Sequence, residues 1–120
     1  MFDTDALSYN LAQTYVDERR YRDAVQLLLP IVADRPRDIA VRLLLAQAYF
    51  HQALLAPAEK HLQVIVDQDP TETYARLLLM RTLERQSRHD EADTQRRLLV
   101  VMTGDEDLTA PRRRTATSAR

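Results

Sequence analysis

Histidine, serine and aspartate are the side chains of this chain that could take part in catalysis or bind a metal, but their spacing favours neither role. The histidines are His51, His61 and His89, and no two of them lie three or four residues apart, the spacing that would place two zinc ligands on one helix face. Ser8 and Ser87 have no neighbouring base at a spacing that would activate them. The absence of cysteine excludes thiolate metal sites and cysteine nucleophiles. We therefore expect no enzyme, no metal and no other cofactor, although the chain could serve as a regulatory subunit of an enzyme.

Composition favours a helical protein. Leucine and alanine dominate, and both are strong helix formers. The one glycine, Gly104, is too small a supply for an all-β fold or a glycine-rich phosphate loop. The longest apolar run, residues 27–33, contains Pro30 and is far too short to span a bilayer. With no signal peptide evident, we expect a cytoplasmic protein without a membrane span.

Charge is distributed unevenly along the chain. Residues 1–108 carry 18 acidic and 13 basic side chains, whereas residues 109–120 carry four arginines and no acid. An acidic body argues against a nucleic-acid binder, because such proteins present basic patches to the phosphates. Pro111, small polar residues and the Arg112–Arg114 run predict that residues 107–120 form a disordered basic tail, which could be simply solubilising or could bind an acidic surface.

The strongest pattern in the chain is a repeat at an offset of 34 residues. A third, looser copy follows the first two, with apolar residues from Leu79 to Leu99 at the next step. A period of this length predicts a solenoid, in which each unit buries its apolar face against its neighbours. The matching pairs are Leu11 and Leu45, Ala12 and Ala46, Tyr15 and Tyr49, Ala24 and Ala58, Leu28 and Leu62, Ile31 and Ile65, and Pro36 and Pro70.

Apolar periodicity and capping residues predict two helices in each copy. Asp38 and Thr71 are expected N-caps, His89-Asp90 reads as a turn with Asp90 as a cap, and Gly104 is a C-terminal stop. His61, beside Lys60, is expected to be a solvated surface residue. The predicted helices run from Asp3 or Thr4 to Glu18, from Tyr21 to Asp34 with Pro30 inside, from Asp38 to Phe50 or Gln52, from Pro57 towards Pro70, from Thr71 to Gln86, and from Asp90 to Met102.

These residue types in this order resemble the tetratricopeptide repeat (TPR) family. The family has a small residue and then an aromatic in the first helix of each repeat, a small residue opening the second helix, and a terminal proline. The matching residues are Ala12, Tyr15, Ala24 and Pro36 in the first copy and Ala46, Tyr49, Ala58 and Pro70 in the second. The resemblance implies an all-α, right-handed α-solenoid of three helical hairpins, at about residues 5–38, 39–72 and 73–106.

The chain departs from the family pattern at several positions. Ser8, Arg42 and Arg76 replace an aromatic residue early in the first helices, and Arg19, Ala53 and Ser87 replace the turn glycine. In the third copy, Leu83, Arg96 and Gly104 replace the tyrosine, a large apolar residue and the proline. Because Arg96 and Arg97 suit a helix that faces water, we predict that the sixth helix ends the stack, with no helix after residue 106.

The resemblance further implies that the first helices line a concave groove. This predicted groove is apolar at its centre, acidic at one end through Asp17 and basic at the other through Arg81 and Arg85, as a helix or extended peptide would require. Its residues are Tyr9, Gln13, Val16, Asp17, Leu43, Gln47, Phe50, His51, Tyr74, Leu77, Arg81, Glu84 and Arg85.

The sequence thus predicts a protein–protein interaction module, either an adaptor and scaffold or a chaperone-like protein, that binds another protein or a peptide. Two alternatives remain: a homo-oligomer whose groove is filled by a symmetry mate, and a groove covered internally through Leu43 and Phe50. Family members that grip heat-shock chaperone carboxylates use Lys, Asn and Arg in the groove. Here the matching positions are Tyr9, Gln13, Leu44, Tyr74 and Leu78, which disfavours that class of partner.

Overall fold

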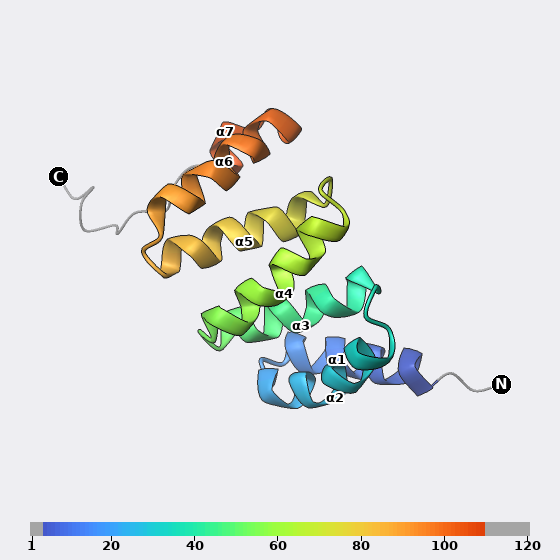
Figure 1. Ribbon diagram of the computed structural model, residues 1–120. Coiled ribbons are helices and arrows are strands. Elements are labelled where there is room, and N and C mark those ends of the chain that lie inside the picture. Colours follow the sequence, from blue (N-terminus) through green and yellow to red (C-terminus); the bar gives the residue numbers. More distant parts are fainter. Residues whose placement is uncertain (1–3, 110–120) are drawn as a thin grey trace.

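The computed structural model describes residues 4–109, which form helices without strands. Three antiparallel hairpins follow one another along an elongated stack of 58 × 29 × 22 Å, with the two ends of the chain at opposite ends (Figure 1). The predicted all-α solenoid of three hairpins is therefore confirmed. The hairpins are α1 (Thr4–Asp17) with α2 (Tyr21–Asp34), α3 (Ile39–His51) with α4 (Leu55–Gln68), and α5 (Thr73–Arg85) with α6 (His89–Thr103), followed by a single turn, α7 (Glu106–Thr109).

Helix beginnings are only partly as predicted. The side chain of Asp38 accepts a hydrogen bond from the Val41 amide at 3.2 Å, which confirms it as the N-cap of α3. The prediction that Thr71 caps α5 is wrong, because Glu72 accepts from the first amides of that helix and Thr71 instead donates to Asp69. Asp90 is not a cap either: it lies in the first turn of α6, where a carboxylate favours the helix dipole.

The repeat positions form the core. Leu28, Leu62 and Ile65 are fully buried, and Ile31 is 3% exposed. The buried residues fall into two clusters, one centred on the first hairpin and α3 and one on α4 with the third hairpin. Consecutive hairpins share these clusters, so each depends on its neighbour for burial.

Two arginines at equivalent repeat positions explain one departure from the family pattern. Arg42 donates to the Pro36 carbonyl at 2.9 Å and lies 2.9 Å from Nδ1 of His61. One repeat later, Arg76 donates to the Pro70 carbonyl at 3.2 Å and to Oε1 of Gln95 at 2.6 Å. Each guanidinium therefore joins its own hairpin to the proline that ends the preceding repeat, a role that an aromatic ring cannot perform.

His61 is not the solvated residue that the sequence predicted. Its ring stacks on Tyr49 at 5.9 Å between centroids, and Nδ1 faces the Arg42 guanidinium. An arginine can only donate, so Nδ1 must carry the lone pair and the ring must be neutral. Burial, followed by the charges of Arg42 and Lys60, lowers the pKa of His61.

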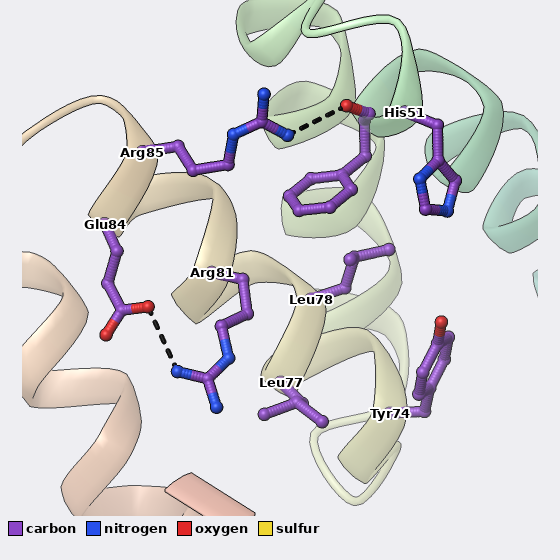
Figure 2. Close-up of a pocket in the computed structure, with 8 residues that line it drawn as sticks. His51, Tyr74, Leu77, Leu78, Arg81, Glu84 and Arg85 are labelled. Atoms are coloured by element: carbon purple, nitrogen blue, oxygen red, sulfur yellow. Dashed lines mark hydrogen bonds and ion pairs between the residues drawn. The ribbon is translucent and has the colours of Figure 1, made fainter. Parts of the chain in front are cut away.

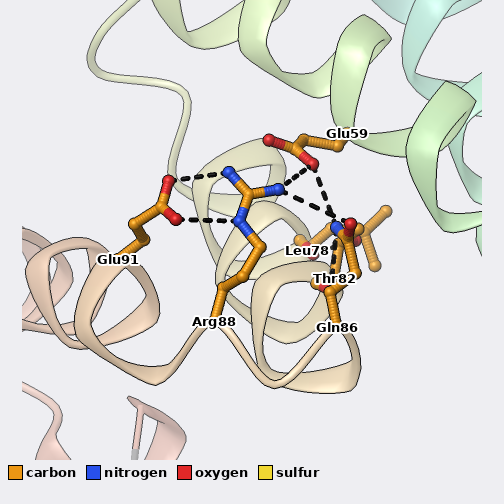
Figure 3. Close-up of polar contacts among 6 residues, drawn as sticks. All are labelled: Glu59, Leu78, Thr82, Gln86, Arg88 and Glu91. Atoms are coloured by element: carbon orange, nitrogen blue, oxygen red, sulfur yellow. Dashed lines mark hydrogen bonds and ion pairs between the residues drawn. The ribbon is translucent and has the colours of Figure 1, made fainter.

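A polar network ties the third hairpin to the second (Figure 3). Arg88, at the α5–α6 turn, contacts Glu59 of α4 at 2.6 Å and Glu91 of α6 at 2.7 Å. Gln86 also donates to Glu59, at 3.0 Å. The hydrogen bonds from Arg88 lower the pKa of Glu91, which keeps that carboxylate charged.

All three hairpin turns use a left-handed residue that is not glycine. Arg19, Ala53 and Ser87 have φ values of 62°, 59° and 61°. In each turn the next residue's amide bonds back five positions, as from Leu54 to the Tyr49 carbonyl at 3.0 Å, which is the Schellman pattern of helix ends. The turns thus have the geometry for which the family uses glycine, at the cost of left-handed strain.

The end of the stack requires one correction. Gly104 ends α6 in a left-handed conformation, as predicted, but a helical turn, α7, follows it and contacts α6. Glu106 lies 34 residues after Glu72, so α7 begins where the first helix of a fourth repeat would begin. The expected absence of a helix after residue 106 is therefore wrong by one turn. The predicted tail from residue 110 onward, with Arg112–Arg114, lies outside the described residues, as does Asp3.

Within residues 4–109, none of the helices is both long and apolar enough to cross a bilayer.

Replacing Ala53 by glycine should stabilise the protein. Relief of left-handed strain of about 1–2 kcal/mol exceeds the extra chain entropy of glycine, so we expect a net gain of about 0.5–1 kcal/mol in the unfolding free energy. Urea denaturation would measure it. Ala56→Gly, at an exposed position with ordinary helical backbone in α4, is the matched control and should lower stability. Equal losses in both variants would contradict the strain argument.

Acid should weaken the fold through His61. Because its folded-state pKa lies below the ordinary value of about 6.5, the neutral ring stabilises the fold above that pH, and this contribution is lost as the pH falls through the folded-state pKa. His61→Gln keeps an acceptor, as Gln95 does, and cannot titrate. Unfolding free energies measured from about pH 7.5 to about pH 5 should fall more steeply in wild type than in the variant, by up to about 1 kcal/mol, the value of one hydrogen bond. Parallel profiles would show that His61 does not titrate in this range.

Candidate functional site

A cavity of about 380 Å³ lies between α3 and α5. Its described lining comprises both apolar and charged side chains, drawn in Figure 2. All of them except Leu78 belong to the predicted groove, and Leu78 was missed because its 3–4 spacing reads as a packing position. The lining residues are Phe50, His51, Tyr74, Leu77, Leu78, Arg81, Glu84 and Arg85.

The spacing of residues on α5 places one wall of the cavity. Tyr74, Leu77, Arg81 and Glu84 follow one another at three- and four-residue steps, which puts them along one helix face. Tyr74 is 45% exposed, and its hydroxyl accepts a hydrogen bond from Gln47 of α3 at 2.9 Å. This bond fixes the ring across the interval between the two first helices.

Phe50 and His51 form the other wall, at the C-terminal end of α3. Their rings meet edge to face at 5.5 Å, and His51 also stacks on Tyr21 at 5.2 Å. The guanidinium of Arg85 lies 4.8 Å above the centre of the Phe50 ring and donates to the Phe50 carbonyl at 3.2 Å. Arg85 thus satisfies a carbonyl at the end of α3, where a cation also favours the helix dipole.

The predicted basic end of the groove is less basic than its sequence suggests. Arg81 and Glu84 form an ion pair at 3.1 Å, and each side chain is only 12% exposed (Figure 2). The pair is electrically neutral as a unit, so Arg85 supplies the net positive charge at this end. One turn of helix separates the two arginines, and the sequence alone could not show which of them is neutralised.

The α1 members of the predicted groove do not line this cavity. Tyr9 lines a separate cavity of about 190 Å³ together with Asp38 and Ala40, and burial, followed by the charge of Asp38, raises the pKa of its hydroxyl. Gln13 donates to that hydroxyl at 3.4 Å, a long hydrogen bond. Val16 packs on the N-terminal core cluster, and Asp17 is exposed at the end of α1.

Two central groove residues also contribute to the fold. Leu43 and Phe50 are half-buried and pack on the second core cluster. The alternative that they fill the core is therefore met in part, although Phe50 still lines the cavity. Substitutions of these two residues would affect folding as well as binding.

Residues 4–109 contain no group of three or more histidine, cysteine, aspartate or glutamate side chains placed to hold a metal ion.

Comparison with known proteins matches the model of the tetratricopeptide repeat family to residues 15–80. The solved first TPR of Spaghetti (RPAP3), bound to an HSP90 peptide, superposes with a TM-score of 0.81 at 15% identity, covering 88% of this chain and 83% of that one. The Arabidopsis OM64 TPR domain gives 0.80 at 14% identity, covering 88% and 87%. MamA from Desulfovibrio magneticus RS-1 gives 0.77 at 25% identity, covering 83% and 56%. A search of the curated proteins finds no match.

The Arg81–Glu84 pair should couple more strongly than an exposed pair of the same spacing. Because both side chains are mostly shielded from water, we expect a double-mutant cycle of Arg81→Gln and Glu84→Gln to give an interaction energy of about 1–2 kcal/mol. Arg20 and Asp23, also three residues apart but about half exposed, are the control and should show little coupling. Chemical denaturation of the single and double variants measures both cycles. Equal coupling in both pairs would contradict the shielding argument.

Proposed function

This chain belongs to the tetratricopeptide repeat family, and we propose that it is a noncovalent protein-interaction module that binds a peptide or partner helix in the cavity between α3 and α5. The cavity itself is the observation that carries this proposal. It is concave, it lies between the first helices of two successive hairpins, and its described lining holds no catalytic arrangement. Binding and release, without a covalent step, are what such a surface can do.

The ligand that suits the cavity is an apolar side chain beside an acceptor group. Phe50, Tyr74 and Leu77 offer apolar surface, which attracts apolar groups out of water. Arg85 provides a cation next to that surface, and part of its hydrogen-bonding capacity is used by the Phe50 carbonyl. The partner segment should therefore combine an aliphatic or aromatic residue with a carboxylate or carbonyl about one helical turn away.

The walls of the cavity are held before any partner arrives. The Tyr74–Gln47 hydrogen bond and the contact of Arg85 with Phe50 both join α3 to α5. A preformed site loses less conformational entropy on binding than a site that must be assembled. This supports a rigid groove that selects its partner by shape and charge.

The Spaghetti TPR binds an HSP90 peptide, but we do not extend that partner to this chain. Two positions that correspond to the chaperone clamp hold Leu44 and Leu78, each 7% exposed and packed in the core. Buried leucines cannot bind a carboxylate. We therefore propose a partner of a different kind.

Capture of partners from a lysate of the source cell tests the proposal. The groove variant, Tyr74→Ala with Arg85→Glu, changes two exposed side chains and should lose the captured partner at least tenfold, about 1.4 kcal/mol, because both an apolar contact and the cation are removed. Quantitative mass spectrometry of the bound fraction measures this loss.

The matched control is Leu29→Ala with Val64→Ala, which removes exposed apolar side chains from the second helices α2 and α4. It should retain the partner at the wild-type level. If the control loses the partner while the groove variant keeps it, the binding surface lies on the second helices and the proposal is wrong. Circular dichroism of all three proteins verifies that each is folded.

A further inference from the structure

The outer face of α1 carries leucines that the other repeats bury. Leu7 is 50% exposed, whereas the residues 34 and 68 positions later, Val41 and Ala75, are 5% and 0% exposed. Leu11 is 44% exposed, whereas its counterparts Leu45 and Leu79 are 0% and 1% exposed. This face is therefore built from core positions, and within the described residues no preceding hairpin covers it.

The charge around this face has one sign. Residues 4–18 contain Asp5, Asp17 and Glu18 and no lysine or arginine. A surface that covers the two leucines should consequently be apolar and should offer a positive charge. These two requirements can be compared with the surfaces that the chain itself presents.

Two of those surfaces fit poorly. A second α1 would bring acidic helix against acidic helix, which costs free energy through like-charge repulsion. The outer side of α6 carries Arg96 and Arg97, but α7 already begins the position that a further first helix would take. An α1 docked there would meet α7.

The α3–α5 cavity meets both requirements. Phe50, Tyr74 and Leu77 supply apolar surface, and Arg85 supplies a net positive charge beside it. Leu7 and Leu11 are one helical turn apart, so a single apolar stripe of α1 could lie along the wall formed by α5.

We propose that the cavity of one copy of this chain takes the outer face of α1 from a second copy. This inference rests on the proposed function and names a partner for the same groove. The contact joins two different surfaces, so it does not close on itself and should build open chains of copies. One helix face against one cavity is small by the standards of stable interfaces, so we expect micromolar or weaker association that competes with other partners.

Complementary variants test this directly. Leu7→Gln with Leu11→Gln removes the donor face and leaves the cavity, whereas Tyr74→Ala with Arg85→Glu removes the acceptor and leaves α1. Sedimentation equilibrium over a wide concentration range should show wild type growing beyond a dimer and each variant alone remaining a monomer. An equimolar mixture of the two variants should form dimers and nothing larger, because only one productive contact can be made. Wild type that stays a monomer, or a mixture that does not associate, would overturn the proposal.

Disulfide trapping distinguishes the arrangement, because the chain has no cysteine of its own. Asn10→Cys places a thiol on the outer face of α1, and His51→Cys places one at the cavity. Oxidising a mixture of the two should give the mixed disulfide, with little of either symmetric product. A dominant Asn10→Cys homodimer would instead show α1 pairing with α1 and would overturn the proposal.

Failure here is separable from failure of the groove as a binding site. The Leu7→Gln, Leu11→Gln variant keeps the cavity, so it should capture a lysate partner at least as well as wild type. If that capture persists while no self-association is found, the groove function stands and the second copy is excluded as its occupant.

Discussion

Each hairpin of this chain can bury its apolar face only against the next hairpin, and the rest of the structure follows from this constraint. The fully buried Leu28, Leu62 and Ile65 lie at positions that repeat every 34 residues, so the same contact is made from one hairpin to the next. A stack of this kind has no central core that could shield its ends. The exposed leucines of α1 and the interrupted turn α7 are therefore consequences of stacking and occur where it stops.

Polar contacts then determine how the hairpins are joined. Arg42 and Arg76 bond to the carbonyls of Pro36 and Pro70, so the residue that ends one repeat is held by the first helix of the next. Arg88 plays a related part through Glu59 (Figure 3). Apolar burial has no direction, whereas these hydrogen bonds fix orientation. Together they hold α3 and α5 at the separation that creates the cavity.

The sequence predicted the helices and the core well, because both depend on local spacing. The 34-residue period located the hairpins, and three- and four-residue steps placed Tyr74, Leu77 and Arg81 on the groove side of α5. The environment of His61 and the neutralisation of Arg81 by Glu84 were not predicted, because they depend on which rotamer each side chain takes in the packed stack. α7 could have been found, since Glu106 continues the series Asp38 and Glu72 at the starts of first helices.

The groove is narrower in extent than the predicted face for a related reason. Curvature of the stack and side-chain packing divide that face into two cavities, one beside Tyr9 and one beside Tyr74. The cavity beside Tyr74 is twice as large, and two contacts fasten its walls together. A partner that binds along the whole face must therefore place its largest apolar side chain at the α3–α5 end, near Arg85. Specificity in this protein should depend on that one anchor position more than on the length of the bound segment.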